Sequence, residues 1–188
     1  MREEEVLCNQ VIENTTITLN QNVEFNNCTF HKVEFHAEEV LKVSFVNTKL
    51  EDCSFNNVSL EDSSFIKTTF KNCSLVGIHM EESLLKNVQF INVNALYAVF
   101  SHSKLDTIGM ENTNLESSTI LSNTLKNVTF SCVNLKKAEI IETSLKGMDM
   151  TSSNIENIIV DLKSIKGMQV NKEQACSLVS LLDIKVIE

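Results

Sequence analysis

An apolar residue recurs at every fifth position over most of the chain. From Phe25 to Val170 every residue in this series is apolar, and all 10 phenylalanines of the sequence belong to it. A second series, two residues earlier, holds small or β-branched residues almost throughout, and the other three positions are mostly polar. This period matches neither the roughly 3.6 residues of a helix nor the roughly 2 of a strand. It predicts a coil that turns about 90° every five residues, with one large and one small side chain inward per side.

Four such sides close a coil of twenty residues, so residues twenty apart should stack on each other. Residues 23–170 then form an all-β solenoid of about seven and a half coils, and the unbroken register leaves no inserted loop. At a corner, stacking predicts an amide ladder of Asn72, Asn92 and Asn112. It also makes Cys53 and Cys73 inward neighbours, which we interpret as small buried thiols.

The N-terminal segment leaves this register. Ile17 and Leu19 have the spacing of an inward pair, but they are out of phase with Val23 and Phe25. Solenoids need a cap at each end of the stack. Residues 1–22 are therefore predicted to form an irregular first turn or cap.

The C-terminal segment changes to a helical pattern after Val170. Asn171 can cap a helix, and Gln174 stands where a capping box requires it. Apolar residues then follow at helical spacing, and residues 184–187 have the pattern of a short strand. Residues 171–188 are predicted to form a helix and strand that cap the solenoid.

The repeat resembles the pentapeptide-repeat consensus, Ala-(Asp/Asn)-Leu-x-x. Val133-Asn134-Leu135 is almost a verbatim copy, as is the segment 153–155. The resemblance covers about four-fifths of the chain. It implies the right-handed, four-sided (quadrilateral) β-helix of the pentapeptide-repeat family.

The C-terminal segment resembles one group within that family. Residues 167–175, the apolar helix and residues 184–187 are similar to the cap of the quinolone-resistance (Qnr-type) proteins, and residues 144–149 look like their Gram-positive members. In that group this module joins two rods end to end, which implies a homodimer here. The alternative is that the same residues only seal the last coil. The implied interface residues are Leu178, Val179, Leu181, Leu182, Ile184 and Val186.

The resemblance also implies a function. Qnr-type proteins are acidic DNA mimics that occupy the DNA-binding saddle of DNA gyrase and topoisomerase IV and protect these enzymes from quinolones. A related role is self-immunity against a gyrase toxin. The Gram-negative members carry loops that matter for protection, and this chain has none. The alternative is a non-catalytic scaffold, a protein-interaction solenoid with an unrelated partner.

Charge is compatible with both functions. The formal net charge of -9 disfavours binding to nucleic acid or to an anionic membrane, and it leaves basic protein partners open. It is under half of the roughly 21 charges on about 36 Å of duplex DNA. The clearest acidic cluster should lie at one corner, with Glu51 and Asp52 on the preceding side, although polar residues are expected at any exposed position. The candidate partner-binding residues are Glu51, Asp52, Glu61, Asp62, Glu81 and Glu82.

Two other outward columns differ from the acidic cluster. One is rich in lysine, with Lys86, Lys126, Lys146 and Lys166 around Asp106. The other predicts an exposed apolar stripe that could bind a partner. This stripe contains Leu41, Leu121 and Ile141.

The sequence argues against catalysis. His31, His36, His79 and His102 are scattered, and the chain has only 4 glycines and no phosphate-binding loop. We therefore expect no enzyme activity, no cofactor and no metal site. The 6 cysteines form no CxxC pair, and the chain shows no secretory signal and no apolar run long enough to span a membrane. These features favour a cytoplasmic protein.

Overall fold

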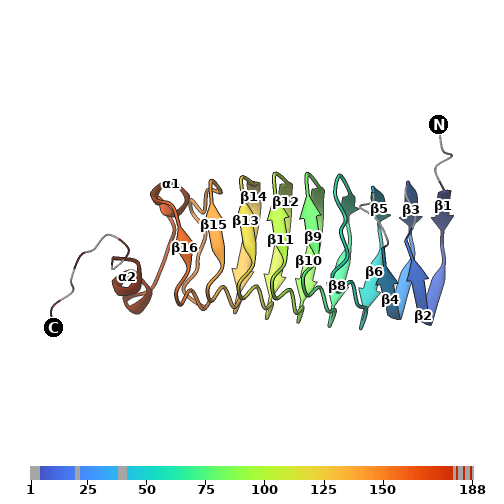
Figure 1. Cartoon of the computed structure of the whole chain (residues 1–188), viewed down its shortest axis with the longest axis horizontal. Helices are drawn as coiled ribbons and strands as arrows, with labels where there is room; N and C mark the ends of the chain where they lie inside the picture. Colours follow the sequence, from blue (N-terminus) through green and yellow to red (C-terminus); the bar gives the residue numbers. More distant parts are fainter. Residues whose placement is uncertain are drawn as a thin grey trace.

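Every strand in the described part of the protein pairs in parallel with a strand one coil away (Figure 1). The computed structural model describes residues 5–19, 22–37, 42–179, 181, 184 and 187. The coils stack into a rod with β1 at one end and helix α2 at the other. The predicted all-β solenoid is confirmed.

The strands form two sheets that cover different sides of the rod. The first sheet contains β1 (Glu5–Cys8), β2 (Val11–Thr18), β3 (Val23–Asn26), β4 (Thr29–His36), β5 (Val43–Val46), β6 (Lys49–Glu51), β7 (Ser64–Ile66), β8 (Thr69–Lys71), β10 (Leu84–Ile91), β12 (Lys104–Glu111) and β14 (Thr124–Ser131). The second contains β9 (His79–Glu81), β11 (Val99–Ser101), β13 (Thr119–Leu121), β15 (Glu139–Ile141) and β16 (Ile159–Val160). The helices are α1 (Leu162–Ile165) and α2 (Lys172–Val179).

We number the four sides from the inward residue that each carries. Side one carries Phe25, side two Phe30, side three Phe35 and side four Leu60. Strand pairs on sides one and two are twenty residues apart, as in Phe45 with Phe65. After β4, side three is held by isolated bridges rather than by long strands. The predicted stacking of residues twenty apart is therefore observed.

The N-terminal segment is more regular than the sequence suggested. Leu7, Ile12 and Ile17 pair with Phe25, Phe30 and Phe35, so the first coil has the five-residue spacing but contains only eighteen residues. The expected irregular turn over residues 1–22 is thus wrong for its described part. Ile17 and Leu19 look out of phase with Val23 and Phe25 because the first coil is two residues shorter than the others.

Most corners are turned by a residue with positive φ, two positions after the large inward residue. Asparagine and aspartate tolerate this left-handed conformation, and they occupy many of the corners, such as Asn72 and Asp62. Other side chains occupy the rest, including the β-branched Thr107 at φ 62. One left-handed residue in every five explains why the chain bends at a regular interval.

Thr107→Asn should therefore stabilise the protein. Thr107 is exposed, so the substitution chiefly relieves backbone strain, and the free energy of unfolding should rise by about 1 kcal/mol. The reverse change at the equivalent corner one coil earlier, Asn87→Thr, should lower it by a similar amount. Urea unfolding of both variants measures these changes in the free energy of unfolding. Variants as stable as the wild type would contradict the backbone strain at Thr107.

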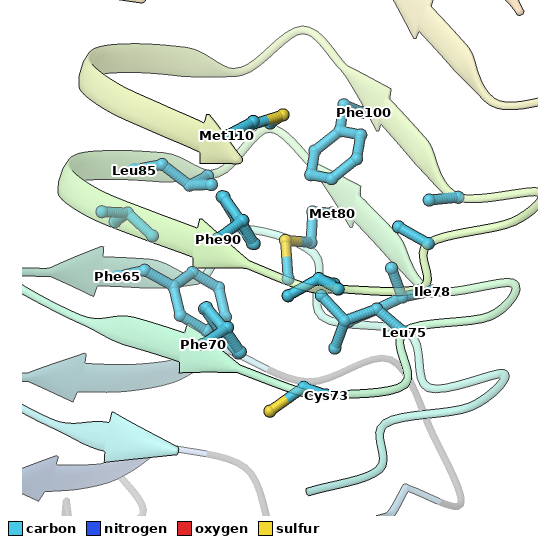
Figure 2. Close-up of a cluster of buried hydrophobic side chains, with 14 of the residues drawn as sticks. Phe65, Phe70, Cys73, Leu75, Ile78, Met80, Leu85, Phe90, Phe100 and Met110 are labelled. Carbon is cyan, nitrogen blue, oxygen red and sulfur yellow. The ribbon is translucent and has the colours of Figure 1, made fainter. Parts of the chain in front are cut away.

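Aromatic rings fill the N-terminal half of the rod. Phe70 is 0% exposed, and its ring centroid lies 5.1 Å from Phe90 in a stacked arrangement and 5.7 Å from Phe65. Figure 2 shows these rings inside the coil, next to Leu75, Ile78 and Met80 from the other sides. The predicted core of large inward residues is thus observed.

A buried hydrogen-bond ladder runs along side one, in the column of small inward residues. Each main-chain N–H donates to a side-chain oxygen one coil further on. The pairs are Val43 to Ser63 (3.0 Å), Ser63 to Ser83 (3.2 Å), Ser83 to Ser103 (2.9 Å), Ser103 to Asn123 (2.8 Å), Asn123 to Thr143 (3.0 Å) and Thr143 to Ser164 (3.1 Å). The column therefore selects polar side chains as well as small ones. The hydroxyls of Ser83 and Ser103 in turn donate to the carbonyls of Leu60 and Met80.

The predicted asparagine ladder is confirmed. The amide of Asn92 donates to Asn72 Oδ1 (3.2 Å), and that of Asn112 to Asn92 Oδ1 (3.3 Å). A second ladder, of Asn94, Asn114 and Asn134, was not anticipated.

Two of the cysteines stack in the core. Cys53 and Cys73 are buried as expected, and the hydrogen bond to Cys53, together with burial, raises the pKa of the Cys73 thiol. These features match small, inert thiols in a narrow column.

The last coil departs from the uninterrupted register that the sequence predicted. Asp161 accepts hydrogen bonds from the backbone N–H groups of Lys163 and Ser164 and so caps α1. Asp161 also accepts from the Ser164 hydroxyl and from the Glu142 N–H. The bond from the Ser164 hydroxyl, together with those from the three N–H groups, holds the pKa of Asp161 far below its usual range. The helical turn absorbs one residue, so Ser164 is buried where Lys163 was expected. The register of twenty returns by Gln169.

Helix α2 closes the C-terminal end. Asn171 and Gln174 exchange main-chain to side-chain hydrogen bonds at 2.9 Å in each direction, which is the predicted capping box. The Gln174 amide also donates to the carbonyls of Met150 and Ser153, so it ties the helix to the last coil. The predicted strand over residues 184–187 falls largely outside the described residues. No helix in the described part of the chain is long and apolar enough to cross a membrane.

Candidate protein-binding surfaces

The acidic corner, which we define as Glu61, Asp62, Glu81 and Glu82, lies where side four turns into side one. The main chain sets the stacking, because the Asp62 N–H donates to the Glu81 carbonyl at 3.0 Å. Asp62 and Glu82 have φ of 48° and 51° and are exposed, whereas Glu61 and Glu81 are half-buried. Four carboxylates are therefore held on a rigid edge, one coil apart.

Little neutralises this corner within the described structure. Lys42 Nζ lies 2.8 Å from Asp62 Oδ2, and His79 Nδ1 lies 3.7 Å from Glu81 Oε1. Both contacts are solvent-exposed, and such pairs are worth only about 0–1 kcal/mol. A basic partner could thus replace them at low cost.

Glu51 and Asp52 do not belong to this corner. They lie on side two, which is opposite side four, rather than on the preceding side as the sequence suggested. Glu51 pairs with Lys71 at 2.6 Å, and this hydrogen bond raises the pKa of Lys71. Asp52 accepts from the Asn72 amide and lies 3.7 Å from His31. Both carboxylates are already engaged within the solenoid.

Charge is segregated between the two adjacent sides that share the corner. Among the described residues of side four, Lys42 is the only lysine or arginine, and the acidic ones are Glu61, Asp62, Glu81, Glu82, Glu139, Glu142 and Asp161. The described basic residues of side one are Lys67, Lys86, Lys104, Lys126, Lys146, Lys163 and Lys166, against Glu5, Glu24 and Asp106. A net charge summed over the whole chain conceals this division.

The additional acidic residues of side four were not identified from the sequence. Glu139, Glu142 and Asp161 stand at outward positions of side four, so sorting charged residues by their place in the twenty-residue coil would have found them. The lysine column was anticipated. Within it, Lys126 lies 3.1 Å from Asp106, and this contact, followed by one with Thr107, lowers the pKa of Asp106.

The apolar stripe is partly observed. Leu121 and Ile141 are paired in β13 and β15 and are half-buried, whereas Leu41 lies outside the described residues. Ile159 and Leu162, which are 54% and 62% exposed, extend the same side toward the C-terminal end. Beyond the acidic corner, side four thus carries these apolar residues among the carboxylates of Glu139, Glu142 and Asp161.

The candidate dimer residues fall into three groups. Leu178 and Val179 are half-buried, and Leu178 packs against the core at the end of the rod. Leu181 and Ile184 are exposed. Leu182 and Val186 lie outside the described residues. One part of this set therefore seals the solenoid, and another part faces solvent.

No cluster of three or more histidine, cysteine, aspartate or glutamate side chains in the described part of the chain could hold a metal ion. The outward surfaces are sheet faces and corners, which suit contacts with a macromolecule.

These features define a class: a four-sided parallel β-solenoid with a charged side for contacts. Two protein-family models match the chain. One describes the pentapeptide repeat region and matches residues 63–140, and the other describes pentapeptide repeats in eight copies and matches residues 44–81. The chain belongs to the pentapeptide-repeat family. A search of curated proteins finds no match.

Solved structures of other pentapeptide-repeat proteins are similar to this one. Full-length QnrB1, a plasmid-mediated fluoroquinolone resistance protein, is 17% identical, with 94% of this chain and 100% of that chain covered and a TM-score of 0.43. HetL, which is involved in heterocyst differentiation regulation in the cyanobacterium Nostoc, is 12% identical, with 88% and 87% covered and a TM-score of 0.48. The fold follows from the strand pairing, and the family from the repeat models.

Proposed function

We propose that this protein is a non-catalytic DNA mimic that binds a type II topoisomerase, DNA gyrase or topoisomerase IV, in the cytoplasm. In this role it protects the enzyme from quinolones or from a gyrase toxin. The observation that carries the proposal is the segregation of charge, with the acidic corner and further carboxylates on side four and only Lys42 opposing them among its described residues.

Rigidity adds to this argument. The main-chain ladder fixes the backbone that carries the carboxylates of successive coils, so no backbone entropy is lost when they meet a basic saddle. An aligned set of charges also steers association with a surface of opposite sign. Side four therefore offers the electrostatic complement that a DNA-binding surface requires.

The C-terminal module supports a homodimer in this proposal. Its sequence resembles that of the Qnr-type cap, and Leu181 and Ile184 expose apolar surface beyond the last coil. End-to-end pairing through α2 and the residues after it would cover this surface and double the length of the acidic rod.

The test is supercoiling by DNA gyrase in the presence of ciprofloxacin. The wild-type protein should restore supercoiling. A variant of the acidic corner, Glu61→Gln, Asp62→Asn, Glu81→Gln and Glu82→Gln, should lose at least ten-fold in potency, because it removes the charges that face the enzyme.

The matched control changes carboxylates on the opposite side. Glu51→Gln with Asp52→Asn removes acidic groups that are already paired, so protection should remain close to that of the wild type. Loss of protection in this control alone, or no protection by the wild-type protein, would contradict the proposal.

A second function, a scaffold with an unrelated partner, is favoured by the apolar residues on side four. Ile159 and Leu162 are more than half exposed and continue Leu121 and Ile141 along one side. Ile159→Ser with Leu162→Ser should leave gyrase protection unchanged if the DNA-mimic proposal is correct. If the protein is a scaffold, the wild type should show no protection, and the double variant should lose its partners in a pull-down.

A further inference from the structure

The main-chain ladder of the solenoid is interrupted between β14 and the next coil. On its N-terminal side β14 pairs with β12 from Thr124 to Ser131. On its other side, the described residues 124–131 form no main-chain hydrogen bond to residues 144–151. At equivalent corners Asn47 donates to Ile66 and Lys67 to Lys86, both at 2.8 Å, whereas Asn127 makes no such bond to Lys146.

The interruption affects only two of the four sides. On side three, the Leu135 N–H donates to the Asn154 carbonyl at 2.7 Å, and the Lys137 N–H to the Glu156 carbonyl at 2.9 Å. On side four β13 pairs with β15. The two coils are therefore joined along sides three and four and separated along sides one and two.

Core side chains are uncovered at the interruption. Leu125, Val128 and Phe130 are half-buried, although their positions point inward. Their counterparts one coil earlier, Leu105, Ile108 and Met110, are all buried. Leu125, Val128 and Phe130 also line an apolar cavity of about 20 Å³. The separation thus forms a slit that reaches the core.

Met148, at the interruption, is larger than the residues before it in its inward column. The narrow inward column of side two holds Cys28, Thr48, Thr68, Val88, Ile108 and Val128 before it holds Met148. A longer side chain in a column sized for small ones forces the neighbouring backbone apart. Gly147, at the adjoining corner, has open space where a Cβ would lie. The oversized residue is therefore adjacent to the corner where Asn127 makes no main-chain bond to Lys146.

Side chains tether both ends of the slit. The Asn123 N–H donates to Thr143 Oγ1 at 3.0 Å, and the Cys132 N–H to Ser152 Oγ at 3.2 Å. The Cys132 bond takes the place of the main-chain bond that Asn112 makes to Ser131 one coil earlier, whereas the Asn123 bond belongs to the ladder of side one. Hydroxyl rotors adapt to small movements more readily than a paired strand does.

We propose that this slit is a hinge built into the solenoid. The part of the rod after it, with its C-terminal helix α2, tilts about the paired sides three and four, and the slit on sides one and two widens and narrows. The acidic corner lies before the hinge, so the tilt sets the angle between that corner and the C-terminal module. This inference does not depend on the topoisomerase proposal.

Hydrogen exchange of the full-length protein, followed by mass spectrometry, tests the hinge. Amides of residues 124–131 and 144–151 should exchange at least ten-fold faster than those of residues 84–91 and 104–111. Residues 134–141, on sides three and four, should stay protected. Exchange in residues 124–131 as slow as in residues 104–111 would overturn the proposal.

A substitution tests the cause. Met148→Val restores the residue size of the earlier coils, so it should close the slit and slow exchange in residues 124–131 and 144–151 at least five-fold. Met80→Val, in a large inward column on side four, is the matched control and should not slow it. Fast exchange that persists in Met148→Val would overturn the role of this methionine. The wild-type profile tests the hinge even if a variant fails to fold.

Discussion

Phe70→Ala should lower the free energy of unfolding by about 3–5 kcal/mol, the usual cost of removing a buried aromatic ring. Phe70 is 0% exposed, stacks on Phe90, and contacts Phe55 and Phe65 edge-on or at a tilt. The coils above and below are held by their own main-chain ladder, so they cannot collapse far into the cavity. Urea unfolding followed by circular dichroism measures the loss.

Two controls distinguish the ring from its surroundings. Phe70→Leu keeps most of the apolar volume and should cost clearly less than the alanine variant. Ile66→Ala removes an outward, half-buried side chain on the adjacent side and should cost at most about 1 kcal/mol. A loss of less than about 1 kcal/mol for Phe70→Ala would show that the aromatic stack does not hold the coils together.

Asn123→Leu should lower the free energy of unfolding by about 2–5 kcal/mol, because it leaves two buried polar groups without partners. The Asn123 amide donates to the Phe100 carbonyl at 2.7 Å, and its Oδ1 accepts from the Ser103 N–H at 2.8 Å. Leucine fills a similar volume, so packing alone predicts little change. Thermal or urea unfolding measures the difference.

The same column supplies the rescue. Asn123→Ser places there the residue found at Ser63, Ser83 and Ser103, so it should retain most of the stability that the leucine variant loses. Thr124→Leu, at the next, exposed position, should change little. A leucine variant as stable as the wild type would mean that the ladder along side one contributes nothing.

The five-residue period was sufficient to predict the solenoid, its core and one amide ladder. Phe25, Phe30 and Phe35 identify three sides by spacing alone, because each side needs one large inward side chain and the sides follow each other every five residues. Asn72, Asn92 and Asn112 then follow from stacking at twenty residues. These features depend on periodicity, which a sequence shows directly.

Other features depend on geometry that the period does not contain. The first coil closes with eighteen residues instead of twenty. When only Ile17 and Leu19 are compared with Phe25, this shorter coil looks like the end of the five-residue pattern. The hydroxyls on side one satisfy main-chain donors, but in the sequence they only look small. Asp161 starts a helical turn within an otherwise regular register.

The candidate site shows the same limit. The stacking of Glu61 and Asp62 with Glu81 and Glu82 could be predicted, because these residues are twenty apart. Placing Glu51 on side two, opposite side four, depends on counting the sides between it and Glu61. Its ion pair with Lys71 could be found only from the side-chain geometry. The uncovering of Phe130 depends on how two coils pack, and the sequence signals it only through the large Met148 in a column of smaller residues.

The most direct test of the central claim is competition between this protein and duplex DNA for gyrase. We predict that linear duplex displaces the bound wild-type protein, that the four-residue variant of the acidic corner binds at least ten-fold more weakly, and that the variant of Glu51 and Asp52 binds like the wild type. Simultaneous binding of protein and duplex, or equal binding by the acidic-corner variant, would contradict the account.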